Sequence, residues 1–124
     1  MTAPNIVDVT TIIGKTDTVA LSSTSQTTLV SNAASSGKVY KINVIQVANV
    51  DGTNAADVTI DVHSAAAGGG TAFSLVSTAS VPSDASLVAL SKNTAIYLEE
   101  DRSITATAST ANDLEVIISY EEIS

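Results

Sequence analysis

The sequence predicts an all-β fold, an antiparallel β-sandwich of the jelly-roll or Greek-key type. β-branched residues and alternating apolar and polar positions dominate the chain, and an apolar stripe with a helical period is absent. Turn signals rich in Gly, Asn, Asp and Ser separate short strand-like segments at regular intervals. With 124 residues the chain fits one domain. A small barrel is the alternative architecture.

About eight to ten short strands are expected, each bounded by polar loops or by Gly and Pro. In chain order the expected strands cover residues 6–13, 18–21, 26–31, 38–50, 56–63, 72–81, 86–90, 95–98, 103–109 and 114–120. Gly14 closes the first strand, and Pro82, which cannot donate to a ladder, begins a connection. In the last strand, alternation predicts that Leu114 and every second residue as far as Tyr120 share one buried face.

Residues 38–50 form the strongest expected strand. They exceed the usual strand length, so a bend or β-bulge is expected within them. The motif "DGTNAAD", residues 51–57, then predicts a hairpin that returns through residues 56–63. In the returning strand the alternation directs Val58, Ile60 and Val62 inward, and it directs His63 outward.

Composition excludes several classes of function. The formal charge is −8 and the five basic residues are scattered, which argues against nucleic-acid binding and against an anionic membrane surface. The absence of Cys excludes disulfides, thiolate metal sites and Cys nucleophiles. We expect neither a Sec signal peptide nor a transmembrane helix. The core is expected to be thin, because it is rich in Ala and contains few aromatic residues, and a thin core favours association with other subunits.

The acidic run Glu99-Glu100-Asp101 is the first candidate site. Two carboxylates that catalyse glycoside hydrolysis must face one cleft, whereas adjacent residues of an extended chain point to opposite faces. The run also lies between two expected strands. A solvated turn is therefore favoured over a cation site and over catalysis.

Three other candidates have simpler interpretations. The loop 51–57 offers oxygen ligands but lacks the Gly and closing Glu of an EF-hand, so an ordinary Asx turn is favoured over calcium binding. His63, the only histidine, has no second His or Cys to complete a zinc site and no triad signature, and is expected to face solvent. The segment "SAAAGGGTA", residues 64–72, has no Lys after it and opens no helix, so it is expected to be a flexible linker.

The tyrosines are expected in the core, because Tyr40, Tyr97 and Tyr120 occupy apolar strand positions. This leaves no aromatic platform for stacking sugar rings. The G-x-S-x-G motif of hydrolases does not occur. We therefore predict no catalytic, cofactor-binding or metal-binding residues, no cofactor and no enzymatic activity.

The segments "SGKVYKINVIQVANVDGTNAADVTIDVH" and "SVPSDASLVALSKNTAIYLEEDRSITATASTANDLEVIISYEEI" carry a resemblance to a known group. Over residues 35–124 their turns and alternation resemble small β-sandwich structural proteins of tailed bacteriophages, including cyanophage-like ones. The group has a Gly-Asp hairpin corner where this chain has Asp101-Arg102, so a different turn type is expected there.

The resemblance implies a non-enzymatic virion protein, most simply a decoration or cement protein on the capsid surface. Its partners would be the major capsid protein or other virion proteins, and it would form a homo-oligomer, with a trimer favoured. Residues 1–20 would be an N-terminal arm or edge strand, and residues 21–124 the sandwich domain. The alternatives are a tail, neck or fibre component, or a receptor- or carbohydrate-binding module that uses loops 51–57 and 64–72.

Overall fold

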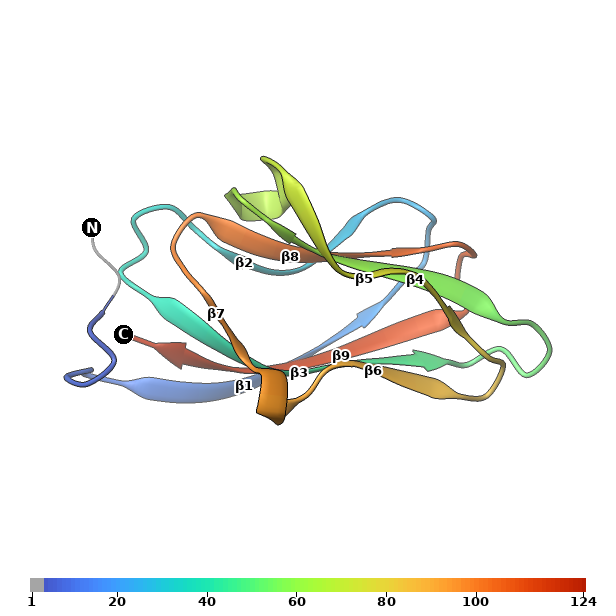
Figure 1. Ribbon diagram of the computed structural model, residues 1–124, viewed down its shortest axis with the longest axis horizontal. Helices are drawn as coiled ribbons and strands as arrows, with labels where there is room; N and C mark the ends of the chain where they lie inside the picture. Colours follow the sequence, from blue (N-terminus) through green and yellow to red (C-terminus); the bar gives the residue numbers. More distant parts are fainter. Residues whose placement is uncertain (1–3) are drawn as a thin grey trace.

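A computed structural model describes residues 4–124 as two antiparallel β-sheets packed face to face (Figure 1). The predicted β-sandwich is confirmed. The strands are β1 (Ile12–Ala20), β2 (Thr27–Asn32), β3 (Val39–Asn49), β4 (Ala56–His63), β5 (Ala72–Val81), β6 (Ser86–Leu90), β7 (Ile96–Leu98), β8 (Arg102–Ala108) and β9 (Leu114–Ile123). Two single 3-10 turns, η1 (Ala66–Gly68) and η2 (Lys92–Thr94), lie in the loops.

The five-stranded sheet has the order β1-β9-β3-β6, and the four-stranded sheet has the order β2-β8-β4-β5. β7 also pairs with β3, through residues 40–42, while β6 pairs with residues 45–48 of the same strand. Strands β1 to β4 therefore alternate between the sheets, and each connection among them crosses the sandwich. β4 and β5 are consecutive in the chain and pair within one sheet.

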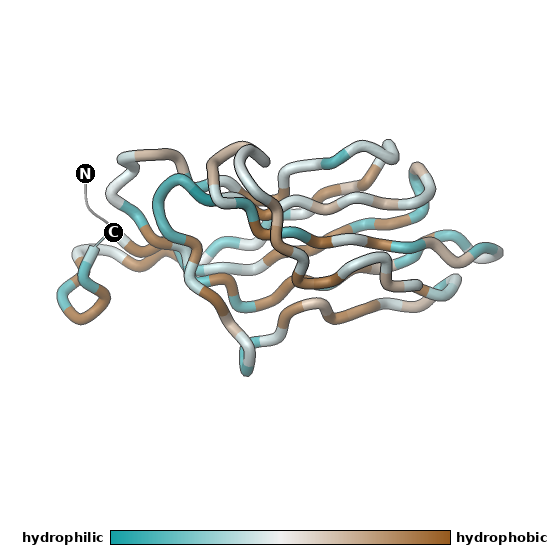
Figure 2. Tube along the Cα trace, turned by 45° about the horizontal axis from the view of Figure 1, so that its top comes forward, coloured by the Kyte–Doolittle hydropathy of each residue, from teal (hydrophilic) through white to brown (hydrophobic). Residues whose placement is uncertain are grey.

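An aliphatic core fills the space between the sheets. Alternation places one side of each strand inward, so that brown and pale positions alternate along the strands in Figure 2. The predicted inward face of β9 is confirmed, because Leu114, Val116, Ile118 and Tyr120 are buried. The largest fully buried side chains are Leu21, Ile42, Ile45, Ile60, Leu98, Ile104, Leu114 and Ile118.

The irregularity expected in the long strand is present. β3 shifts register between Ile42 and Val44 against β9, and between Ile45 and Gln46 against β6. Such bulges bend a strand and increase its twist. β3 can therefore serve two short partners, β6 and β7, in succession along the same edge.

The predicted first strand is wrong. Residues 6–8 form a turn, in which the Asn5 side chain accepts a hydrogen bond from the Val7 N–H at 3.0 Å. The strand begins at Ile12 and runs through Gly14 to Ala20, which also absorbs the separate strand expected at 18–21. The edge of β9 determines where this strand begins and ends, because it provides pairing partners for all nine residues of β1.

The predicted hairpin between residues 38–50 and 56–63 is also wrong. β3 and β4 belong to different sheets. β3 pairs with β9 on one side and with β6 and β7 on the other, so neither edge is free for β4. The acidic corner 99–101 is likewise not a hairpin, because it joins β7 of one sheet to β8 of the other.

Two buried asparagines hold the strand ends where the chain crosses between sheets. Asn49, at the end of β3, donates from Nδ2 to the carbonyls of Asn54 at 3.0 Å and Val81 at 2.9 Å. Its Oδ1 accepts from the Asp51 N–H at 2.9 Å. Asn32, at the end of β2, donates in the same way to the carbonyls of Lys38 and Leu98. Each side chain thereby ties backbone groups of a loop to a strand end of another segment.

Replacing Asn49 with Leu removes these hydrogen bonds while keeping a similar volume. Three buried or half-buried backbone groups then lose their partner, so we expect the free energy of unfolding to fall by at least about 2 kcal/mol. Urea titration measures the change. The control Asn93→Leu alters an exposed residue and should stay within about 0.5 kcal/mol of the parent chain. Equal effects of the two substitutions would contradict the role assigned to Asn49.

Candidate interaction surface

The acidic run forms a turn, as predicted, but two of its carboxylates bind other loops. Glu100 Oε2 accepts from the Gly37 N–H at 3.2 Å, and Asp101 Oδ1 accepts from the Ala66 N–H at 3.0 Å. Asp101 has φ = 56°, in the left-handed region that Gly adopts more easily than other residues. Glu99 is exposed. The two bonded carboxylates reach different loops, so the run is a structural junction.

Residues 64–71, here called the cap segment, are not the expected linker. They fold over the outer face of the four-stranded sheet, where Gly68 donates to Ser103 Oγ at 2.8 Å and Ala67 donates to Ser31 Oγ at 2.9 Å. A Cβ at Gly68 would lie 2.5 Å from the Gln26 side chain, so the glycine permits close approach. Further hydrogen bonds join the cap segment to Gln26, His63, Asp101, Arg102 and Ser103.

His63 is buried, against the expectation that it faces solvent. It points away from the inner core, as alternation requires, but the cap segment covers it and leaves only 3% of its surface exposed. Nδ1 lies 3.2 Å from the Gly69 carbonyl and Nε2 lies 2.8 Å from Thr105 Oγ1. A ring with its proton on Nδ1 satisfies both contacts, because a carbonyl only accepts hydrogen bonds and a hydroxyl can donate. The geometry makes His63 an anchor for the cap segment.

The loop 51–57 is built by Asx-turn chemistry, as predicted. Asp51 accepts from the Thr53 N–H at 2.9 Å, and this bond keeps the pKa of Asp51 below its usual value. Burial and the nearby Asp51 charge raise the pKa of Asp113. Within residues 4–124, no group of three or more His, Cys, Asp or Glu side chains is placed to hold a metal ion.

The three tyrosines have different environments. Tyr120 is buried and lies 5.3 Å, centroid to centroid, from the half-buried Tyr40. Tyr97 is 50% exposed, so its expected core position is wrong. It stands on the outer face of the five-stranded sheet because β7 pairs it with Lys41 rather than with an inward residue. With Pro4, Ile6, Val39 and Glu99 it lines a hollow of about 340 Å³.

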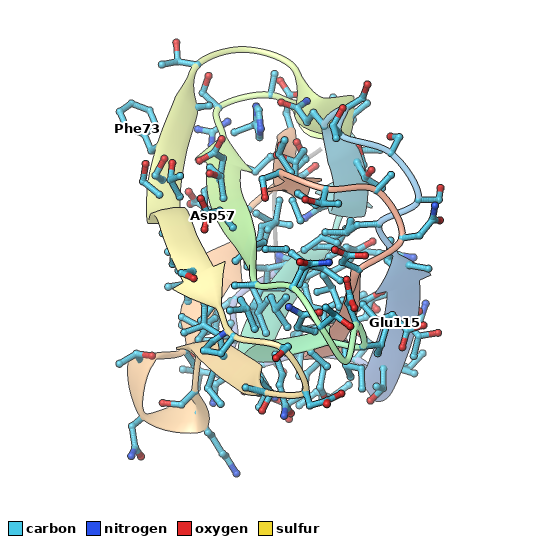
Figure 3. All side chains as sticks on the ribbon, turned by 90° about the vertical axis from the view of Figure 1, so that its right-hand side faces the viewer. Asp57, Phe73 and Glu115 are labelled. Carbon is cyan, nitrogen blue, oxygen red and sulfur yellow. The ribbon has the colours of Figure 1, made fainter. Side chains whose placement is uncertain are left out.

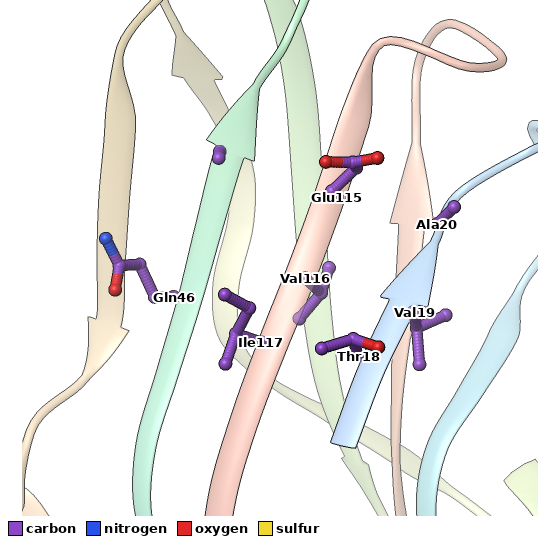
Figure 4. A pocket seen from close by; sticks show the side chains of 8 residues that line it. Thr18, Val19, Ala20, Gln46, Glu115, Val116 and Ile117 are labelled. Atoms are coloured by element: carbon purple, nitrogen blue, oxygen red, sulfur yellow. The ribbon is translucent and has the colours of Figure 1, made fainter. Parts of the chain in front are cut away.

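A second, larger hollow crosses the outer face of the five-stranded sheet (Figure 4). Its volume is about 510 Å³. Small and apolar side chains dominate it, and Ile117, which is 45% exposed, lies at its centre. Glu115 is its only ionisable lining residue. The lining residues are Thr18, Val19, Ala20, Gln46, Ala48, Glu115, Val116 and Ile117. The hollow can accept contacts but does not bring together an acid, a base and a nucleophile.

Both sheets end in exposed edge strands. β5 borders the four-stranded sheet, and Phe73 projects from it with 65% of its surface exposed (Figure 3). β1 borders the five-stranded sheet, and only Val19 among its side chains is even half-buried. Exposed edges carry unpaired N–H and C=O groups that can pair with another chain. These edges and the outer face of the five-stranded sheet are the candidate interaction surface of the molecule.

Ion pairs and hydrogen bonds hold β1 in place at its inward side. Glu122 bridges Lys15 at 2.9 Å and Lys38 at 2.8 Å, and the Tyr120 hydroxyl donates to Asp17 at 2.9 Å. The hydrogen bonds from Lys38 and Lys15 lower the pKa of Glu122, and those to Glu122 raise the pKa of both lysines. Burial and the bond to Asp17 raise the pKa of Tyr120.

Comparison of the chain with protein-family models finds no match, and comparison with curated protein sequences finds none either. Among the described residues, no helix has the length and apolar character needed to cross a membrane.

Replacing Ser103 with Ala should loosen the cap segment. Ser103 is fully buried, and its hydroxyl accepts from Gly68 and donates to the Ala65 carbonyl. Losing both bonds should cost about 1–3 kcal/mol and should accelerate amide hydrogen exchange within residues 64–71. The exposed Ser80→Ala is the matched control. Unchanged exchange in the cap segment of the Ser103 variant would rule out this anchoring role.

Replacing Glu122 with Gln should make stability less dependent on pH. Because the folded-state pKa is lowered, the carboxylate stabilises the fold above its unfolded pKa of about 4.3, and this contribution disappears as pH falls through the folded pKa. We expect the variant to be less stable by about 1 kcal/mol at neutral pH, and we expect this difference to shrink as the pH falls below the unfolded pKa. Thermal unfolding across this range tests the sign, with Glu99→Gln as control. A difference that grows on acidification would refute it.

Proposed function

We propose that this protein is a non-enzymatic structural component of a tailed-bacteriophage virion, a decoration or cement protein on the capsid surface. The observation that carries the proposal is the exposed candidate interaction surface, whose free strand edges and hollows offer contacts. Within residues 4–124, neither hollow brings together an acid, a base and a nucleophile. The turn and strand pattern of residues 35–124, which resembles such virion proteins, supplies the biological setting.

The arrangement of the strands supports a jelly-roll assignment. The N-terminal strands β1 and β2 pair with the C-terminal strands β9 and β8, in opposite sheets. In a jelly roll the chain folds back on itself in this way, and its strand pairs then wrap across two sheets. The jelly roll is a common architecture of viral capsid proteins. The formal charge of −8 favours solubility of a domain displayed at high density.

The proposed arm is confined to the residues before β1. Residues 12–20 pair with β9 of the same chain, so they belong to the sandwich as an edge strand. Residues 4–11 form no strand, and Val7 is 90% exposed. Residues 1–3 lie outside the described part of the chain. We expect this short segment to contact a neighbouring virion subunit by adding to a sheet edge.

Quantitative mass spectrometry of purified virions tests the proposal, with copy number referenced to the major capsid protein. Hundreds of copies would support a place on the capsid lattice. A few copies to some tens would instead support a neck, tail or fibre component. Absence from particles would refute the virion role.

A receptor- or carbohydrate-binding module is the second candidate. The exposed ring of Tyr97 favours it, because sugar rings stack on exposed aromatic faces. The folded cap segment weakens it, since residues 64–71 are bonded to the sheet rather than free to bind a ligand. Binding on a glycan array that Tyr97→Ala abolishes and Tyr40→Phe preserves would favour this candidate.

A further inference from the structure

β1 has one paired edge and one free edge. Thr11 and Ser124 exchange backbone hydrogen bonds of 2.9 Å in each direction, and the Leu21 N–H donates to Leu114 at 3.0 Å. Because hydrogen-bonded and non-hydrogen-bonded pairs alternate in an antiparallel ladder, the odd residues 13–19 also direct their N–H and C=O groups toward β9. The even residues of β1 direct theirs outward. Within residues 4–124, no strand pairs with that outer edge.

The free edge lacks several usual protections against pairing. β1 is nine residues long, contains no Pro, and keeps a continuous register with β9 without a bulge. Lys15, near the middle of β1, points to the inward side of the strand. An inward-pointing charge disfavours pairing with another strand unless that strand places an opposite charge beside it. Asp17 lies two residues away on the same side.

The sequence of β1 is complementary to itself in one antiparallel register. About a two-fold axis at Thr16, Lys15 of each copy faces Asp17 of the other, so two ion pairs form. Ile13 faces Val19 on the same side of the strand. On the opposite side, Ile12 faces Ala20, Gly14 faces Thr18 and Thr16 faces its own counterpart. Apolar residues thus meet apolar residues, and each charge meets its opposite.

We propose that β1 pairs with β1 of a second copy of this chain, antiparallel and centred on Thr16, so that the five-stranded sheets of two subunits form one continuous sheet. This contact is isologous, since the same patch serves both subunits. It does not depend on the virion role. It gives a two-fold contact, whereas the family resemblance implies a trimer.

The hydrogen-bond geometry agrees with this register. The even residues, including Thr16, fall in hydrogen-bonded pairs, which gives about ten new backbone hydrogen bonds across the axis. The odd residues fall in the narrower non-hydrogen-bonded pairs, where side chains approach most closely. Lys15 and Asp17 face each other in such pairs. The Lys15 side chain is 42% exposed, so it can meet Asp17 while remaining bound to Glu122.

The two neighbouring antiparallel registers are opposed by charge. An axis at Lys15 would place the two lysines opposite each other, and an axis at Asp17 would do the same to the two aspartates. A parallel in-register pairing would also oppose like charges, which is destabilising for directly facing residues. Lys15 and Asp17 therefore favour the antiparallel register centred on Thr16, in which both of them face an opposite charge.

Sedimentation equilibrium at about 0.15 M salt, where repulsion between the negatively charged subunits is largely screened, tests the proposal. We expect a reversible species of twice the 12.6 kDa chain mass. Thr16→Pro removes an N–H that points to solvent, so the β1–β9 ladder persists while the central contact is lost. The dimer dissociation constant should rise at least about tenfold. Thr16→Val retains the N–H and should retain the dimer.

A cysteine cross-link provides an independent test, because the chain contains no Cys. Thr16→Cys places one thiol per subunit beside the two-fold axis, and oxidation at micromolar protein concentration should give a covalent dimer in high yield. Ser77→Cys, exposed on β5 at an edge of the four-stranded sheet, should cross-link far less. A monomer up to about millimolar concentration, a trimer indifferent to Thr16→Pro, or equal cross-linking of the two variants would each overturn the proposal.

Discussion

Each time the chain crosses between the two sheets, backbone groups leave one hydrogen-bonded ladder before they enter the next. Asn49 and Asn32 bind backbone groups at two such crossings, and both are buried. An amide suits this position because it donates and accepts through one rigid group. The wrapped strand order depends on these junctions, since leaving a buried carbonyl unsatisfied costs about 1–3 kcal/mol, more than a typical hydrogen bond contributes.

The outer face of the four-stranded sheet depends on the same principle. Ser103 and Thr105 point away from the apolar core, yet both are buried because the cap segment lies over them. The Ser103 hydroxyl and His63 Nδ1 bond to a loop composed of Ala and Gly, which has no polar side chains of its own at its centre, and the Thr105 hydroxyl bonds to Nε2 of the same histidine. The only histidine is thus a structural residue, held between a strand and a loop.

The two sheets differ in what covers their outer faces. The four-stranded sheet is covered at one end by the cap segment, whereas the five-stranded sheet presents a hollow around Ile117 and a free strand, β1. β1 is held mainly by its ladder and by polar contacts of Lys15 and Asp17, with little burial of its side chains. A strand of this kind contributes little to the core and is free to contribute to an interface, which accords with a structural role.

The sequence by itself determined the all-β class, most strand positions from residue 26 onward, the inward face of β9 and the bulge in β3, because alternation and turn residues are local signals. The tertiary structure decided which strands pair. β3 and β4 look like a hairpin in sequence, but β9, β6 and β7 occupy both edges of β3. It also decided the exposure of Tyr97 and the start of β1, because each depends on a partner distant in the chain, the outer face of β3 and the edge of β9. The burial of His63 was decided in the same way, since the cap segment that follows His63 is held over it by the distant Ser31 and Ser103.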